Sequence, residues 1–97
     1  MEIGEFQRRM RALYGAKDAA RGPDATFLYF VAEVGELAEA CREPQRHDLA
    51  GEFADCFAWL VSLADLHGID LEAAVARKYP AVCRRCGSSP CACSGKP

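Results

Sequence analysis

The sequence predicts an all-α fold, an antiparallel bundle of about four helices that is completed by dimerisation. Apolar residues recur at helical spacing along four stretches, and no stretch shows the alternation of apolar and polar residues that marks a strand. Glycine and proline separate these stretches. A chain of 97 residues forms at most one domain and buries a limited fraction of its surface. We therefore expect a second subunit to cover part of the apolar faces.

The first two helices are predicted on either side of a break rich in glycine. The first covers about residues 3–14. Gly15 and the Arg-Gly-Pro segment at 21–23 are expected to end it. Asp24 is a good N-cap, so the second helix is expected from there to about Arg42.

The last two helices are predicted after a short loop. Asp48 is a second good N-cap, for a helix that runs to about His67, and Gly68 is expected to cap its C-terminus. A shorter fourth helix is expected to begin near Asp70. It should stop before Pro80, because proline cannot continue a helix.

Charge is unevenly distributed along the chain. Residues 1–76 carry 14 acidic and 7 basic side chains, whereas residues 77–97 carry 5 basic and no acidic ones. An acidic body argues against a nucleic-acid-binding surface, while the basic tail could meet an anionic ligand. No apolar run approaches the ~18–20 residues that span a bilayer, and residues 1–10 contain no signal-peptide core. We expect a cytoplasmic protein that makes no contact with membranes.

Two pairs of carboxylates border the apolar faces of the second and third helices. Glu33 and Glu36 lie three residues apart, and so do Glu52 and Asp55. Packing the two faces together would bring all four carboxylates close, where like charges repel and half-buried carboxylates are costly without partners. A hard cation such as Mg²⁺ or Mn²⁺ would resolve that conflict, and Mg²⁺ commonly meets substrate phosphates. The alternative is a set of solvated charges on amphipathic helices.

Six cysteines fall into two groups. Cys41 and Cys56 lie in apolar helical stretches, where cysteine behaves as a small hydrophobe. The tail at 81–97 carries the pattern C-x2-C-x4-C-x-C. In a chain without a secretory signal this pattern favours metal binding over disulfides, and it predicts a structural Zn²⁺ site. The alternative is a flexible, reduced tail. The four ligands would be Cys83, Cys86, Cys91 and Cys93.

Three segments resemble the short, single-domain type of MazG-like nucleotide pyrophosphohydrolases. They are FVAEVGELAEA at 30–40, EFADCFAW at 52–59 and GIDLEAAV at 68–75. The family signature is E-E-x-x-E, a spacer, and E-x-x-D. The resemblance extends over roughly residues 3–80 and also takes in the segment at 17–27. The cysteine tail is not part of it.

The resemblance implies an all-α, Mg²⁺-dependent enzyme that hydrolyses nucleoside triphosphates, non-standard ones included, to monophosphate and pyrophosphate. Such enzymes assemble as homodimers or tetramers. Residues 1–80 would form the MazG-like domain and residues 81–97 a zinc-binding tail. The metal would bridge triphosphate oxygens and activate or orient the attacking water. By position, the metal ligands and catalytic residues would be Glu33, Glu36, Glu52 and Asp55.

One position departs from the family signature. Ala32 stands where the family has its first glutamate, a residue associated with a second metal or with the water. This leaves open the number of metals in the site. Glu39 is a poor substitute, because it projects further from the core on the helical wheel. The departure favours a second hypothesis, a non-catalytic oligomeric module that binds nucleotide or a partner.

Four further side chains are candidates for substrate contacts. The basic ones would pair with phosphates and the tryptophan would stack on a base; the alternatives are solvated charges and a core aromatic. Asp18 is either a cap or a pocket residue. A third hypothesis, a zinc-ribbon-like adaptor, rests on the basic excess of the tail alone. The four candidates are Lys78, Trp59, Lys17 and Arg21.

Overall fold

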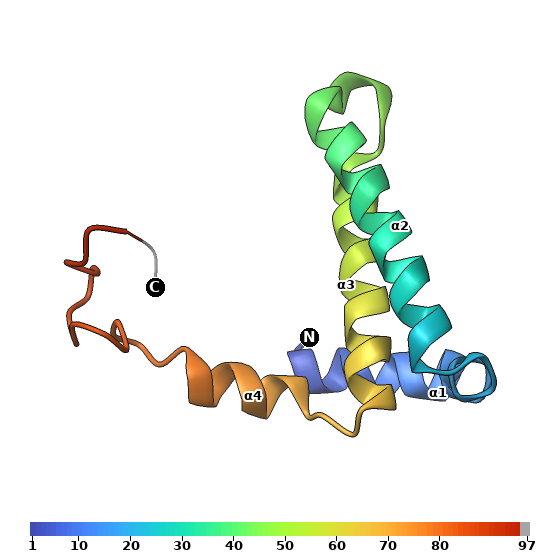
Figure 1. Cartoon of the computed structure of the whole chain (residues 1–97), viewed down its shortest axis with the longest axis horizontal. Coiled ribbons are helices and arrows are strands. Elements are labelled where there is room, and N and C mark those ends of the chain that lie inside the picture. The colour runs from blue at the N-terminus through green and yellow to red at the C-terminus, as the bar shows by residue number, and fades with distance from the viewer. Residues whose placement is uncertain (96–97) are drawn as a thin grey trace.

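A computed structural model describes residues 1–95, and every regular element among these residues is a helix, with no strand. Helices α2 and α3 form an antiparallel hairpin, α1 crosses its base, and α4 leads away toward the tail (Figure 1). The last two residues of the predicted tail lie outside this range. The predicted fold class is confirmed. The helices are α1 (Ile3–Arg21), α2 (Pro23–Arg42), α3 (Leu49–Leu66) and α4 (Leu71–Lys78), with a short 3-10 helix η1 (Pro44–Arg46) between α2 and α3.

The boundary between α1 and α2 differs from the prediction. Helix α1 continues through Gly15, because a single glycine inside a helix costs only about 1 kcal/mol. The chain turns instead at Gly22, whose φ of 88° favours glycine. Pro23 then occupies the first position of α2, where its missing N–H is not needed. Asp24 therefore lies inside the first turn, and its prediction as N-cap was wrong.

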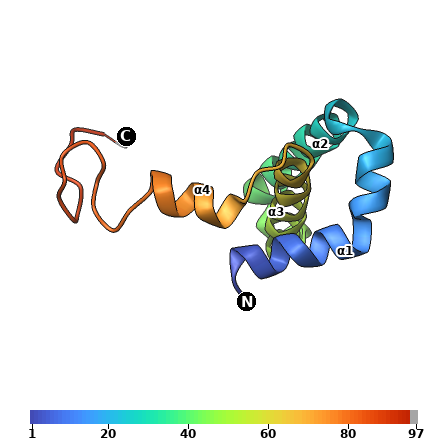
Figure 2. The same ribbon diagram turned by 90° about the horizontal axis from the view of Figure 1, so that it is seen from below.

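The caps of α3 and α4 confirm the prediction. Asp48 accepts a hydrogen bond from the N–H of Gly51 at 3.1 Å, and Asp70 accepts one from Ala73 at the same distance. Each bond satisfies an N–H that the first helical turn leaves without a partner. Helix α3 ends just before Gly68, which adopts a φ of 68°. Viewed from below, α4 extends away from the hairpin on the side opposite the α1–α2 turn (Figure 2).

The apolar core of the single chain is small. Among the described residues, five apolar side chains are buried, and several large ones on α2 and α3 stay exposed. Leu28 is 69% exposed, and Phe53 is 55% exposed. No described helix is long and apolar enough to cross a membrane. The buried apolar residues are Met10, Ala40, Cys56, Val61 and Ala64.

A buried glutamine fixes the turn between α3 and α4 against α1. Gln7 is 4% exposed. Its Nε2 donates to the carbonyl of Ile69 at 2.8 Å, and its Oε1 accepts from the N–H of Leu71 at 3.1 Å. Nearby, Arg11 Nε donates to Asp65 Oδ1 at 2.8 Å. These polar contacts set the direction in which α4 leaves the bundle.

Replacing this glutamine should destabilise the fold. We expect Gln7→Leu to lower the free energy of unfolding by about 1–3 kcal/mol, because two part-buried backbone groups lose their partner. Denaturant unfolding at one fixed protein concentration measures the change. Gln45→Leu, at an exposed position of η1, is the matched control and should have little effect. Equal stability of the two variants would contradict this interpretation of Gln7.

Candidate metal centre and adjoining cavity

Three carboxylates meet on the seam between α2 and α3. Glu33 and Glu36 lie one turn apart on α2, and Glu52 lies in the first turn of α3, directly after the Asp48 cap. Each offers one carboxylate oxygen, and these three oxygens lie within 4.8 Å of one another. Figure 1 shows α2 and α3 side by side and antiparallel, which places segments far apart in the sequence next to each other. Spacing of this kind is suited to binding a cation between helices.

The carboxylates are poorly compensated by the protein itself. Glu33 Oε2 and Glu52 Oε2 are buried, and neither has a hydrogen-bond partner among the described residues. Burial raises the pKa of Glu33 above its ordinary value, and the neighbouring Glu36, Asp55 and Glu52 raise it further. Burial and the same four carboxylates also raise the pKa of the Cys56 thiol. A divalent cation with oxygen ligands fits this donor set, because it would satisfy both orphaned oxygens and offset the repulsion.

Asp55 stands beside this group. It is exposed and lies outside the set of three oxygens, although its charge acts on Glu33. It also lines a cavity of about 390 Å³ between α1 and α3. Asp55 therefore connects the carboxylate group with the cavity. The other lining residues are Met10, Tyr14, Lys17, Asp18, Arg21, Ala58, Trp59 and Ser62.

Trp59, which lines the cavity, stacks on Tyr29 of α2, and the Arg21 guanidinium lies over both rings. The rings of Tyr29 and Trp59 are stacked, with centroids 5.3 Å apart and planes at 15°. The Arg21 guanidinium carbon lies 5.0 Å from the Trp59 ring centroid. Arg21 also donates to Asp18 Oδ1 at 2.9 Å and to Thr26 Oγ1 at 3.2 Å. Arg21 and Trp59, two of the four side chains predicted to contact substrate, thus already make contacts within the protein.

The two predicted lysines differ in position. Lys17 lines the cavity one turn before Arg21 and is exposed. In the part of the chain that the structure describes, it has no carboxylate within ion-pair distance. Lys78 ends α4, with its Nζ 5.9 Å from the Tyr79 ring centroid, and does not line the cavity. Of these two lysines, Lys17 is therefore the one that lines the cavity.

Sequence reasoning missed the Tyr29 contribution and left Asp18 undecided. Asp18 lines the cavity and is buried, at 6% exposure. Its ion pair with Arg21 holds the Arg21 guanidinium in place. Tyr29 precedes Glu33 by four residues, as Asp55 precedes Trp59 by four. Residues four apart lie on one helix face. Tyr29 therefore shares a face of α2 with Glu33, and Trp59 shares a face of α3 with Asp55. Because the carboxylates were expected to meet, the same spacing indicated that the two rings could also meet.

The departure at Ala32 is not compensated nearby. Ala32 and Glu39 are both exposed on α2, and Glu39 is not among the converging carboxylates of the described residues. The acidic group therefore consists of Glu33, Glu36 and Glu52, with Asp55 beside it.

A second group of possible metal ligands lies in the tail. The four thiols are free, and their sulfur atoms lie within 4.8 Å of one another. Both views place the tail beyond α4, away from the α2–α3 hairpin (Figures 1 and 2). Backbone N–H groups of Ala92 and Ser88 lower the pKa of Cys86 to about 6. The cluster consists of Cys83, Cys86, Cys91 and Cys93.

Comparison with known families identifies one matching family for most of the chain. The profile of the family described as MazG nucleotide pyrophosphohydrolase domain matches residues 21–86, about two thirds of the chain. The match spans α2, α3 and α4 and includes all four site carboxylates. It ends at Cys86, so it covers only the first two cysteines of the tail. A search of curated proteins finds no match.

The pKa of Glu33 predicts how stability depends on pH without metal. As the pH rises above 4.5, the unfolded chain loses this proton before the folded chain does, so folding stability falls. Glu33→Gln carries no such proton. In EDTA its thermal midpoint should match that of the wild type near pH 4 and exceed it at pH 7.

Added Mg²⁺ should stabilise the wild type more than Glu33→Gln, because the variant lacks one ligand. Thermal unfolding followed by circular dichroism measures both effects. Glu39→Gln, on the same helix but exposed, controls for the loss of one charge. If Glu33→Gln were no more stable than the wild type at pH 7 in EDTA, the charged Glu33 carboxylate would not destabilise the metal-free fold, and this interpretation would be wrong.

Proposed function

Because the chain belongs to the MazG nucleotide pyrophosphohydrolase domain family, we propose that it is a Mg²⁺-dependent nucleoside triphosphate pyrophosphohydrolase. The reaction would convert a nucleoside triphosphate and water to the monophosphate and pyrophosphate. One observation carries the proposal: two buried carboxylate oxygens, on Glu33 and Glu52, have no hydrogen-bond partner among residues 1–95 and belong to a group of three converging carboxylates. Such an arrangement is costly for a protein that binds no cation there.

Each site residue has a place in this reaction. Glu33, Glu36 and Glu52 would hold Mg²⁺, and Asp55 would act where the carboxylate group adjoins the cavity. When bound, Mg²⁺ offsets the charge of the triphosphate and lowers the pKa of a coordinated water. Asp55, which is exposed, would orient the attacking water or accept its proton.

The cavity supplies the remaining contacts. Lys17 would pair with the phosphates, because it is exposed and lies on the α1 wall. Arg21 is held by Asp18 and would mainly position the Trp59 ring. The stacked rings of Tyr29 and Trp59 offer an apolar edge against which a nucleobase could pack. Lys78 would reach a phosphate only if it were brought there by another subunit.

We also propose that the active form is a homodimer or a tetramer. Large apolar side chains on both helices of the α2–α3 hairpin are exposed, and exposed apolar patches are typical of protein–protein contact sites. A second hairpin packed on these faces would create a four-helix core. The side chains concerned include Phe27, Leu28, Val31, Phe53 and Leu60.

One observation favours the second candidate function, a non-catalytic binding module. Ala32 replaces an acidic residue of the family signature, and Glu39 does not join the carboxylate group. Such a module would keep the cation site and the cavity. It would bind a nucleoside triphosphate with Mg²⁺ and release no pyrophosphate.

Hydrolysis assays distinguish the two candidates. The wild type is expected to release pyrophosphate and monophosphate from at least one nucleoside triphosphate in a panel of standard and non-standard bases, and EDTA should abolish this. Glu36→Gln and Asp55→Asn should each lower kcat/KM by more than about 100-fold, beyond the cost of losing an outer-shell partner of a metal.

Glu39→Gln is the matched control for that assay and should stay within about twofold of the wild type, a change of less than 0.5 kcal/mol in the barrier. No pyrophosphate from any nucleotide at high protein concentration would overturn the proposed activity. If Glu36→Gln and Asp55→Asn both kept full activity, the residue assignment would be wrong.

The assembly is tested by placing a charge on the exposed hairpin face. We expect Phe53→Asp to shift the protein from dimer or tetramer toward monomer, because a carboxylate would have to be desolvated in the interface. Analytical ultracentrifugation over a range of concentrations measures this shift. Val82→Asp, exposed but in the tail, is the control. A wild-type chain that stays monomeric at high concentration would contradict the proposal.

A further inference from the structure

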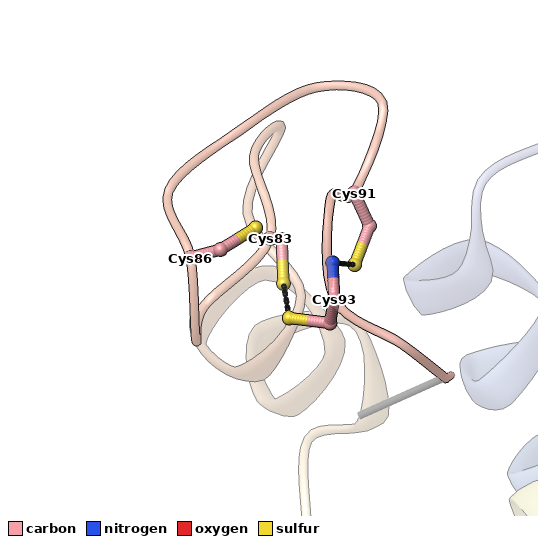
Figure 3. A group of neighbouring side chains, drawn as sticks. All are labelled: Cys83, Cys86, Cys91 and Cys93. Carbon is pink, nitrogen blue, oxygen red and sulfur yellow. Dashed lines mark hydrogen bonds between the residues drawn. The ribbon is translucent and has the colours of Figure 1, made fainter.

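The four tail cysteines converge from two short segments. Figure 3 shows the Cys83 and Cys93 sulfurs facing each other across the loop, with Cys86 and Cys91 on either side of them. The Cys83 and Cys93 sulfurs are 3.9 Å apart. Tetrahedral thiolate ligands at about 2.3 Å from a Zn²⁺ ion lie about 3.8 Å from one another. This pair already has the separation that a shared zinc ion requires.

The backbone around Cys83 and Cys86 forms a tight turn. The Gly87 N–H donates to the Cys83 carbonyl at 2.7 Å, and the Cys83 N–H donates to the Ser88 carbonyl at 2.9 Å. Gly87 has a φ of 73°, which favours glycine. The C-x2-C-G sequence therefore holds two thiols on the same side of one turn.

Backbone N–H groups point at the sulfurs. Arg85 N–H donates to Cys83 Sγ at 3.4 Å, Ala92 N–H to Cys86 Sγ at 3.4 Å, and Cys93 N–H to Cys91 Sγ at 3.3 Å. Such donors stabilise negative charge on the sulfur, which is the form that binds a metal. With a metal bound, these N–H groups would help to orient its sulfur ligands.

We propose that the tail binds one Zn²⁺ ion per chain through Cys83, Cys86, Cys91 and Cys93. Four thiolates close the tetrahedral site and leave no position for water or substrate, so the ion organises residues 81–95 and takes no part in hydrolysis. The proposal does not depend on the proposed activity, because no carboxylate of the α2–α3 seam belongs to the site.

Metal binding would also change the charge of the tail. Four neutral thiols release their protons, so the metal and its four thiolates together carry a formal charge of −2. Arg84 and Arg85 lie between the first two ligands and are exposed. They would offset part of this charge. The basic excess of the tail is then explained as local compensation, with no anionic partner required.

Metal analysis of the full-length wild-type chain tests the proposal directly. We expect one zinc per chain after purification with a reductant and washing with EDTA at a concentration that strips weak sites. Cobalt substitution should give sulfur-to-metal charge-transfer bands and the intense visible bands of tetrahedral cobalt. Cobalt bound by carboxylates lacks the charge-transfer bands, so the spectrum separates the two sites.

Variants test the ligands one at a time. Cys83→Ser and Cys93→Ser should each lower the retained zinc below 0.1 per chain, whereas Cys41→Ser, an exposed thiol at the end of α2, should leave it at one. Helical content by circular dichroism checks that each variant folds. If a ligand variant fails to fold, the cobalt spectrum of the wild type still shows whether four thiolates bind the metal.

Trypsin digestion tests independently whether the zinc ion has a structural role. Arg84 and Arg85 are cleavage sites inside the zinc-binding turn, and a protease must unfold a segment to cut it. Stripping the metal with a strong chelator should speed cleavage after these residues at least tenfold, as followed by mass spectrometry. The other arginines in α1 and α2 provide the internal comparison.

Four results would overturn the proposal. They are stoichiometric zinc retained by Cys83→Ser, a cobalt spectrum without thiolate bands, iron in place of zinc in the purified chain, and a disulfide between tail cysteines in reduced preparations. None of these results bears on pyrophosphate release. Failure of the zinc site and failure of the proposed activity are therefore distinguishable.

Discussion

The repulsion among carboxylates on the α2–α3 seam is the constraint around which the rest of the structure is arranged. Helices α2 and α3 pack against each other, and the buried apolar residues on them include the small side chains Ala40, Cys56 and Ala64. This packing brings Glu33 and Glu52 together and shields one oxygen of each from solvent. The apolar contact between the helices and the cost of the acidic group are thus parts of the same packing.

Most of the fold followed from local rules that the sequence displays. Asp48 and Asp70 cap helices because an aspartate there can reach the N–H of the third helical residue. Gly15 and Gly22 show where such rules fail. A glycine weakens a helix without ending it, and only a left-handed φ, here followed by proline, reverses the chain. Which glycine turns depends on the contacts of α1 with α3, which no local pattern records.

The candidate site was predictable where it depends on helical spacing and less so where it depends on contacts between helices. Spacing of three residues predicted that Glu33, Glu36, Glu52 and Asp55 converge. The first three do, and Asp55 lies beside them, outside the set of converging oxygens. The partners of Arg21 and the stacking of Tyr29 on Trp59 depend on how α1 and α2 meet α3. Sequence reasoning therefore considered Arg21 and Trp59 singly and missed Tyr29. The cysteine tail carries its ligand spacing within a few residues, and there local pattern and geometry agree.

The carboxylates of each helix lie one turn apart, and this spacing limits which insertions and deletions such a domain can tolerate. One residue inserted inside α2 or α3 would rotate everything beyond it by about 100° and carry a carboxylate off the seam. Substitutions on the outer faces do not have this effect. The short segment around η1, at the far end of the hairpin, can change length without altering the phase of either helix (Figure 1). Drift in length should therefore collect at this loop, while α2 and α3 keep a constant count of residues.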